Sequence, residues 1–280
     1  MKVSIVTTSF NQANYLQKNL DSVASQIYDD YEHIIIDPGS NDGSRELIEE
    51  YAKSNKNVVK IFEPDDGQVD AINKGLTLAE GEVLTWLNSD DYYDNSNVLN
   101  DVCEGFGRDK QISVLYGRGL RVDHRGEKLS EAFVHPDKTD FKETLKSSIG
   151  ILQPSLFFKR RVFDTVGGLD DKYNLQLDYE YWIRIAKANF KFGKVNKIFS
   201  RATVHQDAKS TGQRKEQLNE CLFLMQEQYG FIHDSWLKRY AEFYATGEDR
   251  KVTKNIKKDK LTLDLESAVY QGLNVYVRKS

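Results

Sequence analysis

The sequence predicts an α/β fold, in which a mainly parallel sheet carries helices on both faces. Over residues 1–120, short apolar runs typical of buried strands alternate with segments whose apolar side chains recur at helical spacing. Polar and turn-forming residues follow the first, second and fourth of these runs, at the edge where such sheets bind ligands. The length of 280 residues allows one large domain with a small appendage.

The N-terminal part of the chain is expected to alternate strands with helices. Apolar runs typical of buried strands occur at residues 3–6, 33–36, 58–62 and 83–87. Between them, apolar side chains recur at helical spacing in residues 15–27, 47–52 and 69–79. Asn14 is a candidate cap for the first of these helices, and Gly81 is well placed to end the third.

From about residue 113 the pattern changes. Short strands are expected at residues 114–116, 120–122 and 155–158, and the second of them leads into a hairpin turn at 123–126. Helices are expected at residues 141–148, 161–166 and 179–188. Beyond Gly212 the sequence becomes helical and charged, with apolar stripes at Leu218, Leu222 and Met225, at Leu237, Tyr240 and Phe243, and a weaker candidate helix at 261–275.

Composition excludes several classes of protein. The chain has 43 Asp and Glu against 39 Lys and Arg, a net charge of −4, which argues against a nucleic-acid-binding protein. Cys103 and Cys221 lie far apart, so a disulfide framework and a CxxC zinc site are excluded and a reducing compartment is favoured. The N-terminal apolar run is short, and no stretch approaches the ~18 apolar residues of a membrane span. We therefore expect a cytoplasmic protein, with at most a peripheral contact at the inner face of the membrane.

Two adjacent carboxylates, Asp90 and Asp91, follow the apolar run at 83–87, directly after Asn88 and Ser89. Adjacent carboxylates repel each other unless a cation or hydrogen-bond donors compensate their charge. Oxygen ligands at a strand end suit Mg²⁺ or Mn²⁺ shared with a diphosphate. The other interpretation is an Asp-rich turn, and these residues alone leave both interpretations open.

Asp178 and His205 are further candidates for chemistry. Asp178 stands at the start of an expected helix, where it is either an N-cap or a general base that deprotonates an acceptor hydroxyl, and Glu180 competes for the second role. His205 is either structural or a neutral imidazole that completes a metal shell or contacts a phosphate. No Ser-His-Asp spacing, Walker loop or GxGxxG motif supports acyl transfer, P-loop hydrolysis or dinucleotide chemistry.

Several segments follow one another in an order that is typical of a known family. Residues 3–11 with 15–26 correspond to its opening strand and helix, and residues 34–44 to its nucleoside-binding strand end. Residues 63–75 correspond to the loop and helix before its DXD metal motif, and Asn88-Ser89-Asp90-Asp91 stands where that motif is expected. The pattern continues through Gln153-Pro154-Ser155, Gly167-Gly168-Leu169-Asp170, Asp178-Tyr179-Glu180-Tyr181-Trp182 and Arg184. Over about residues 1–210 the sequence therefore resembles family 2 of the glycosyltransferases, inverting enzymes of the GT-A fold.

The resemblance implies a Rossmann-like GT-A domain, a nucleotide-diphosphate-sugar donor, and Mg²⁺ or Mn²⁺ as the divalent cation. A UDP-sugar is favoured, a GDP-sugar is also compatible, and the implied acceptor is a saccharide or a lipid-linked saccharide. The residues that match the nucleotide-binding positions of the family are Thr8, Asp37, Asp66 and Asp90. The metal positions fall on Asp90, Asp91 and His205, and the catalytic base falls on Asp178.

The implied reaction is metal-dependent sugar transfer with inversion, in the synthesis of a cell-surface polysaccharide or glycolipid. Two positions depart from the family pattern: Pro38 stands where members often carry a second acid, and Asn88 replaces the first acid of the DXD motif. Two other functions stay open. One is a sugar nucleotidyltransferase, although residues 7–12 lack its Gly-rich basic loop; the other is a non-catalytic nucleotide-sugar binding protein.

The resemblance also divides the chain. A GT-A domain is implied over residues 1–210, with a nucleotide-sugar half at 1–112 and an acceptor half at 113–210, followed by a helical C-terminal extension at 211–280. Within the extension, aromatic residues are interleaved with Lys and Arg at 236–240 and 274–279. Such stretches contact a membrane surface or, as we favour here, pack against the parent domain or against the second subunit of a homodimer.

Overall fold

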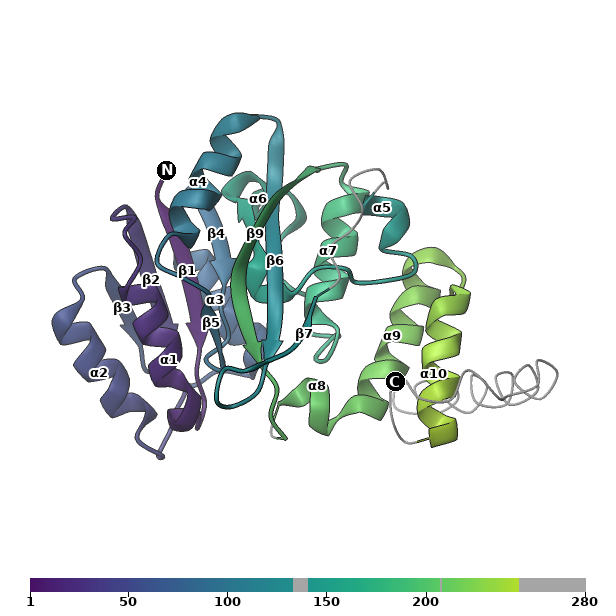
Figure 1. The fold of residues 1–280 in the computed structure, drawn as a ribbon, viewed down its shortest axis with the longest axis horizontal. Helices are drawn as coiled ribbons and strands as arrows, with labels where there is room; N and C mark the ends of the chain where they lie inside the picture. Colours follow the sequence, from purple (N-terminus) through teal and green to yellow (C-terminus); the bar gives the residue numbers. More distant parts are fainter. Residues whose placement is uncertain (133–140, 207, 247–280) are drawn as a thin grey trace. The chain divides into compact units, whose positions relative to one another are not determined.

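The computed structural model of the chain describes residues 1–132, 141–206 and 208–246 (Figure 1). By its internal contacts the chain divides into two compact units. The first comprises Met1–Asp137 and Gly150–His205, and the second comprises Lys138–Ile149 and Gln206–Ser280. The functional domains predicted from the sequence, with boundaries near residues 112 and 210, stay a prediction.

Within the described residues, the first unit is built on a nine-stranded sheet with the strand order β3-β2-β1-β4-β8-β6-β9-β5, and β7 pairs with β6. The four strands of its N-terminal half are β1 (Val3–Thr8), β2 (Tyr31–Ile36), β3 (Val58–Ile61) and β4 (Val83–Trp86). All three pairings among these strands are parallel. The segments that follow the four strands therefore start from one edge of the sheet, as the sequence predicts.

Helices cover both faces of these parallel strands. On one face, α1 (Ala13–Ala24) and α2 (Ser44–Ser54) pack around Ile35 of β2. Val6 of β1 pairs with Ile34, so its side chain points to the opposite face, because side chains alternate along a strand. There it lies against Gly75 of α3 (Gln68–Leu78), where an added Cβ would collide with it. The predicted fold class is confirmed.

The second half of the sheet is mixed. β8 (Leu156–Lys159) runs antiparallel to β4, and β6 (Ile112–Val122) runs antiparallel to β8. β9 (Lys191–Thr203) is parallel to β6, and β5 (Asp91–Tyr93) is antiparallel to β9. The remaining elements of this unit are α4 (Val98–Arg108), η1 (Gln153–Ser155), α6 (Arg160–Val166) and α7 (Leu177–Lys187).

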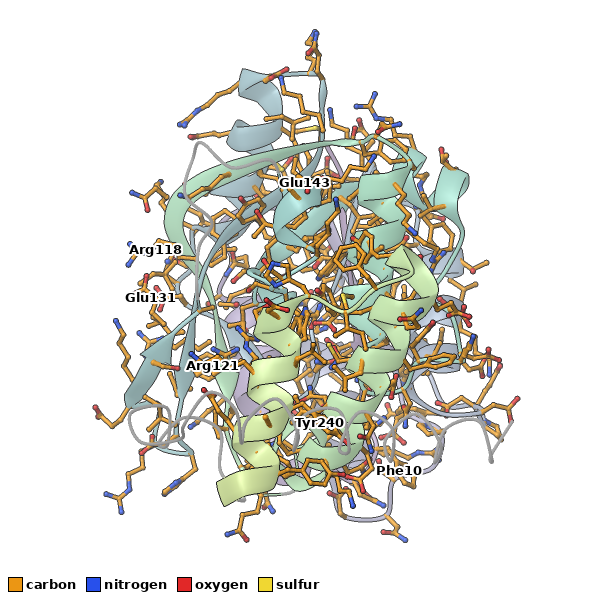
Figure 2. The ribbon with its side chains drawn as sticks, turned by 90° about the vertical axis from the view of Figure 1, so that its right-hand side faces the viewer. Phe10, Arg118, Arg121, Glu131, Glu143 and Tyr240 are labelled. Atoms are coloured by element: carbon orange, nitrogen blue, oxygen red, sulfur yellow. The ribbon has the colours of Figure 1, made fainter. Side chains whose placement is uncertain are left out.

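The predicted hairpin at 123–126 joins β6 to β7 (Lys128–Glu131). Gly126 closes the turn by donating its N–H to Asp123 O at 2.9 Å, and its φ of +89° is one that glycine adopts readily. Figure 2 shows Arg118 and Glu131 side by side on this hairpin, where Arg118 Nε donates to Glu131 Oε1 at 2.6 Å. The prediction of two short strands at 114–116 and 120–122 was wrong, because one long strand spans both.

Two predicted helix boundaries were also wrong. Asn14 lies inside α1, whose first N–H groups are instead satisfied from the loop after β2: Ala13 N donates to Asp42 Oδ2 at 2.9 Å. Gly81 lies beyond the end of α3, which is reached at Leu78. It is needed for close packing, because an added Cβ would lie 2.5 Å from Ser4 Oγ.

The described part of the second unit is helical, with α5 (Phe141–Thr144), α8 (Lys209–Gly212), α9 (Arg214–Tyr229) and α10 (Asp234–Thr246). The predicted stripe of Leu218, Leu222 and Met225 is buried in α9. Trp236 and Tyr240 of α10 are buried as well, and Tyr240 is labelled on this helix in Figure 2. The predicted packing of the 236–240 stretch against the parent domain or a second subunit stays a prediction. The candidate helix at 261–275 and the stretch at 274–279 lie outside the described residues. None of the described helices is long and apolar enough to span a membrane.

Candidate active site

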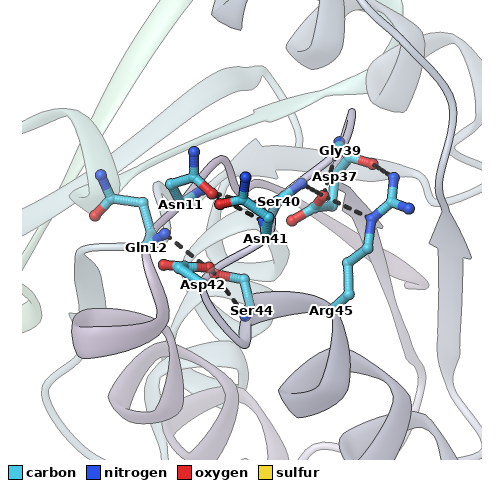
Figure 3. A network of polar contacts seen from close by, with 9 residues as sticks. All are labelled: Asn11, Gln12, Asp37, Gly39, Ser40, Asn41, Asp42, Ser44 and Arg45. Atoms are coloured by element: carbon cyan, nitrogen blue, oxygen red, sulfur yellow. Dashed lines mark hydrogen bonds and ion pairs between the residues drawn. The ribbon is translucent and has the colours of Figure 1, made fainter.

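The loops that follow β1 and β2 are joined by a network of polar contacts at the carboxyl edge of the sheet (Figure 3). Asn11 N donates to Ser40 Oγ at 2.8 Å, and Asn41 N donates to Asn11 Oδ1 at 3.0 Å. Asn11 adopts a positive φ of 52°, which asparagine tolerates better than most residues. The network fixes the two loops against each other and thereby places the side chains at their bases.

Asp37 directly follows β2 at this edge and is fully buried. Its Oδ1 accepts three hydrogen bonds, from Gly39 N at 3.0 Å, from Ser40 N at 2.8 Å and from Arg45 Nε at 3.1 Å (Figure 3). Its Oδ2 is buried and has no hydrogen-bond partner among the described residues. A buried carboxylate oxygen without a donor is costly, so this atom is suited to receive a donor from a ligand.

Thr8 and Asp66 lie at the same edge. Thr8 is the last residue of β1 and pairs in register with Ile36, which brings it next to Asp37. Asp66 lies in the loop between β3 and α3, where its side chain is exposed and its backbone N–H donates to Asp70 Oδ2 at 3.0 Å. The structure thus brings the three predicted nucleotide-binding residues of the first three loops to one edge of the sheet.

The turn at 88–91, which follows β4, is held by buried amide side chains. Asn19 of α1 donates its Nδ2 to Asn88 O at 2.9 Å and to Asp91 O at 3.0 Å. Asn88 Oδ1 accepts from Gln68 Nε2 at 3.1 Å, and Asn88 Nδ2 donates to Gln153 Oε1 at 3.3 Å. The amide at position 88 can donate and accept, so it joins α3 to η1, which a carboxylate could not do in the same way.

The sequence predicted no role for Asn19, Gln68 or Gln153, although the last two lie in segments that carry the family pattern. Asn19 could have been found, because it is a polar residue on the otherwise apolar face formed by Leu16, Leu20 and Val23 of α1. Gln68 and Gln153 are the first residues of α3 and η1 and carry no comparable pattern. Their role depends on which chain segments meet at the turn.

Asp90 and Asp91 occupy different surroundings. Asp90 Oδ2 and His205 Nε2 share a hydrogen bond of 3.0 Å across 115 residues of sequence, and the His205 ring stacks on Tyr15 with 4.1 Å between centroids. Asp91 points inward, where its Oδ1 accepts from Thr203 N at 3.2 Å. Burial, together with the neighbouring charge of Asp90, raises the pKa of Asp91 well above that of a free aspartate.

Across the part of the chain that the structure describes, no group of three or more His, Cys, Asp or Glu side chains is arranged to hold a metal ion. Asp90 and His205 nevertheless offer an oxygen and a nitrogen side by side, and His205 Nδ1 is buried without a partner among the described residues. Mg²⁺ is commonly bound through one or two protein ligands plus substrate phosphates. The pair therefore fits a cation that is shared with a diphosphate.

Asp178 lies in the first turn of α7, and the residue at the N-cap position is Gln176. The interpretation of Asp178 as the N-cap was therefore wrong. Its Oδ1 accepts from Tyr179 N at 2.8 Å, and burial raises its pKa to about 6. The competing acid Glu180 is engaged elsewhere, because both of its oxygens accept from Arg184, at 2.6 and 2.8 Å.

Aromatic packing places the N-terminal turn of α7 beside the carboxyl end of β4. Trp182, one helical turn after Asp178, stacks on Trp86, the last residue of β4, with 5.3 Å between ring centroids. Tyr181 contacts Phe158, which pairs with Leu84 further back along the strand. α7 ends at Lys187, shortly before β9 begins at Lys191 beside Ile112, the start of β6. Because β6 and β4 both run antiparallel to β8, the start of β6 lies at the amino edge of the sheet. The helix therefore runs opposite to β4, and its first turn lies towards the carboxyl edge.

Comparison with known proteins agrees with this geometry. The family profile described as glycosyl transferase family 2 matches residues 4–167, which is more than half of the chain. The chain belongs to glycosyl transferase family 2. It is 28% identical over 206 residues to the chondroitin synthase of Pasteurella multocida (strain Pm70), a match that covers 73% of this chain and 21% of that synthase. This family 2 glycosyltransferase chain thus spans about a fifth of that relative's length.

Two solved structures share the fold. One is S. aureus TarS 1-349 in complex with UDP-GlcNAc, with a TM-score of 0.62, 15% identity, and coverage of 87% of this chain and 80% of that chain. The other is the mannosyltransferase PcManGT from Pyrobaculum calidifontis in complex with GDP-Man and Mn²⁺, with a TM-score of 0.61, 16% identity, and coverage of 97% and 73%. The predicted family and the GT-A fold are confirmed. The roles predicted for individual site residues stay predictions.

Proposed function

We propose that this chain is a metal-dependent, inverting glycosyltransferase that moves a sugar from a nucleotide-diphosphate donor to a hydroxyl acceptor. One observation carries the proposal. Asp178, a half-buried acid whose pKa is raised to about 6, lies in the first turn of α7, on the side of the carboxyl edge where Asp90 contacts His205. A carboxylate with this pKa is well matched to general-base catalysis near neutral pH.

The donor nucleotide would lie at the carboxyl edge of β1 to β4. Asp37 Oδ2, which has no partner among the described residues, would accept an N–H of the nucleobase, and Thr8, Asp66 and Asp90 would contact the rest of the nucleotide. Phe10 follows β1 and is 58% exposed, so its ring offers a surface on which a base can stack. A UDP-sugar is the favoured donor, and the complexes of TarS with UDP-GlcNAc and of PcManGT with GDP-Man support the two candidate classes.

Asp90 and His205 would hold Mg²⁺ or Mn²⁺ together with the diphosphate oxygens. When bound, the cation supplies Lewis-acid neutralisation of the charge that grows on the leaving diphosphate. The Mn²⁺ in the PcManGT complex supports a divalent cation in this fold. Asp91, also expected to be a ligand, holds the turn against β9 through Oδ1, so it would contribute to the cation through Oδ2.

Asp178 would accept the proton of the attacking hydroxyl while the new bond from that oxygen to the anomeric carbon forms. The bond from the anomeric carbon to the diphosphate breaks in the same step, and the nucleotide leaves with the electron pair. Because Glu180 is paired with Arg184, no second acid in this turn is free to form a glycosyl-enzyme intermediate. A single displacement of this kind inverts the anomeric configuration.

The acceptor is proposed to be a saccharide or a lipid-linked saccharide, and the product a cell-surface polysaccharide or glycolipid. The similarity to the chondroitin synthase of P. multocida supports a polysaccharide product. A peripheral contact with the inner face of the membrane is part of the same proposal, since it would bring the site to a lipid-linked acceptor. A homodimer is proposed as well.

The full chain should release nucleotide from one class of UDP- or GDP-sugar in the presence of Mn²⁺ and an oligosaccharide acceptor. Asp178→Asn should abolish transfer and leave nucleotide binding near normal, whereas Asp171→Asn, an exposed neighbour on the same segment, should be fully active. Proton NMR of the product should show an inverted anomeric centre. Transfer at the wild-type rate by Asp178→Asn, or a product with retained configuration, would contradict the mechanism.

Formation of a nucleotide sugar from a nucleoside triphosphate and a sugar phosphate would instead show that the chain is a nucleotidyltransferase. Binding of nucleotide sugars without turnover would show that it is a non-catalytic binding protein.

A further inference from the structure

The two oxygens of Asp37 have very different surroundings. Oδ1 is the acceptor of three hydrogen bonds, two from backbone N–H groups and one from Arg45 Nε, while Oδ2 has none within the described residues (Figure 3). A carboxylate oxygen has about two lone pairs, so the backbone donors already use its strongest directions, and Arg45 takes the one position that a further donor could share. Only one oxygen of this buried carboxylate is left for a ligand.

Arg45 keeps the carboxylate in this orientation. Its Nε donates to Asp37 Oδ1, and its Nη2 donates to Asp37 O at 3.2 Å, so one guanidinium holds both the side chain and the backbone of the same residue. The guanidinium lies over the Phe62 ring, with 4.8 Å from Cζ to the centroid. Because the planar guanidinium binds Asp37 through two nitrogens and stacks on Phe62, the Asp37 carboxylate has little freedom to rotate.

The residue that follows Asp37 adds no second acceptor. Pro38 stands where a second acid would offer further carboxylate oxygens, and proline has neither a polar side chain nor a backbone N–H. The site therefore presents one buried anionic acceptor rather than two adjacent ones. Ligand bases differ in how many acceptors they need at this position.

Uracil presents one ring N–H flanked by two carbonyl oxygens, so a single acceptor satisfies its donor. Guanine presents a ring N–H beside an exocyclic amino group, and a carboxylate that reads this edge uses both of its oxygens. With Oδ1 saturated, guanine would keep one donor without a partner in a buried place, which strongly disfavours binding.

We propose that Arg45 is a specificity-determining residue, which selects uracil-type over guanine nucleotides by taking the last donor position on Asp37 Oδ1. The inference rests on the proposed function, because it takes Asp37 as the contact to the base. Arg45 itself acts through Asp37 and is a positioning residue.

The test compares UDP and GDP binding to the full chain by isothermal titration calorimetry with Mn²⁺ present. Both nucleotides carry the same ribose and diphosphate, so the ratio of their dissociation constants isolates the base. The wild type should prefer UDP by more than about tenfold, the factor that one hydrogen bond to a charged group supplies. Arg45→Met keeps the aliphatic contact with Phe62 but removes the third donor to Oδ1, and leaves the bonds from Gly39 N and Ser40 N in place. A donor of guanine can then take the vacated position, so the preference should fall by about tenfold.

Lys60→Met is the matched control, because Lys60 also lies over the Phe62 ring, at 5.7 Å, and is paired with Glu49 rather than with Asp37. It should keep the wild-type preference. Arg45→Lys keeps the charge but replaces the two-point fork by one ammonium, so it should also lower the preference, and it covers the case in which Arg45→Met does not fold.

The outcomes separate the two proposals. A folded wild-type chain that binds neither UDP nor GDP would defeat the proposed function itself. Binding of both nucleotides with equal affinity, a preference for GDP, or an unchanged UDP preference in a folded Arg45→Met or Arg45→Lys variant would overturn only the role of Arg45. A loss of preference in Lys60→Met would also overturn it, since the effect would then not pass through Asp37.

Discussion

Replacing Asp178 by Asn is expected to stabilise the protein at neutral pH while it removes activity. The carboxyl of Asp178 has a pKa of about 6 in the folded chain, against 3.8 for an ordinary aspartate, and the cause is burial. The folded state therefore disfavours the charged form. Asn has nearly the same shape, carries no charge, and keeps an oxygen that can accept from Tyr179 N.

The size of the effect follows from the two pKa values. Their difference, about 2, corresponds to about 3 kcal/mol of unfolding free energy, and partial exposure of Asp178 lowers the expectation to about 1–3 kcal/mol. Below pH 3.8 the acid is protonated in both states, so variant and wild type should be equally stable. As the pH rises through about 6, Asp178 ionises in the folded wild type, and the free energy of unfolding falls. The variant has no carboxyl at this position, so its free energy of unfolding does not fall in this way.

Urea unfolding at pH 4 and at pH 8 measures the difference. A Trp236→Phe background leaves Trp86 and Trp182, whose stacked rings pack beside the site, as the fluorescent reporters. Asp171→Asn, an exposed neighbour, should show no pH-dependent change relative to the wild type. If Asp178→Asn were no more stable at pH 8 than at pH 4 relative to the wild type, burial would not be the cause of the raised pKa and the reasoning would fail.

Further expectations concern pH dependence, the turn, the cation and packing. The kcat/KM of the wild type should fall as the pH drops below about 6, because Asp178 must be ionised to accept a proton, and a flat profile would argue against it. Asn19→Leu should destabilise the chain by about 1–3 kcal/mol in urea unfolding and should lower kcat, because the carbonyls of Asn88 and Asp91 lose their donor. Unchanged stability and kcat would show that Asn19 does not hold the turn at 88–91. His205→Ala should raise the Mn²⁺ concentration needed for half-maximal activity, and an unchanged Mn²⁺ titration would exclude it as a ligand. Gly81→Ala should lower the thermal midpoint, since its Cβ meets Ser4 at 2.5 Å, whereas Gly107→Ala meets nothing within 4 Å and should not.

The N-terminal half of the fold could be predicted because three of its strands, β1, β2 and β4, are buried on both faces. Such strands read as continuous apolar runs, as Ile34-Ile35-Ile36 does, and they stand out against the helical spacing between them. The long strand β6 could not be predicted in one piece, because Gly117 and Gly119 interrupt it. Both glycines are there for packing: a Cβ at Gly117 would collide with Phe199 of β9, and one at Gly119 would collide with Leu152. The sequence shows the glycine but not the neighbour that requires it.

By itself, the sequence determined the fold class, the family, and the acids that follow the strands of the parallel sheet. These properties depend on local periodicity and on motif order, which neighbouring residues carry. Only the tertiary structure decided how those acids differ from one another: Asp90 meets His205, Asp91 turns inward to Thr203, and Glu180 is paired with Arg184. The partners of Asp90 and Asp91 come from β9 and the residues just beyond it, more than a hundred positions away, and α7 acquires its place from the stacking of Trp182 on Trp86. The chemistry of a carboxylate depends on its burial and its donors, and both are set by the segments that the fold packs around it.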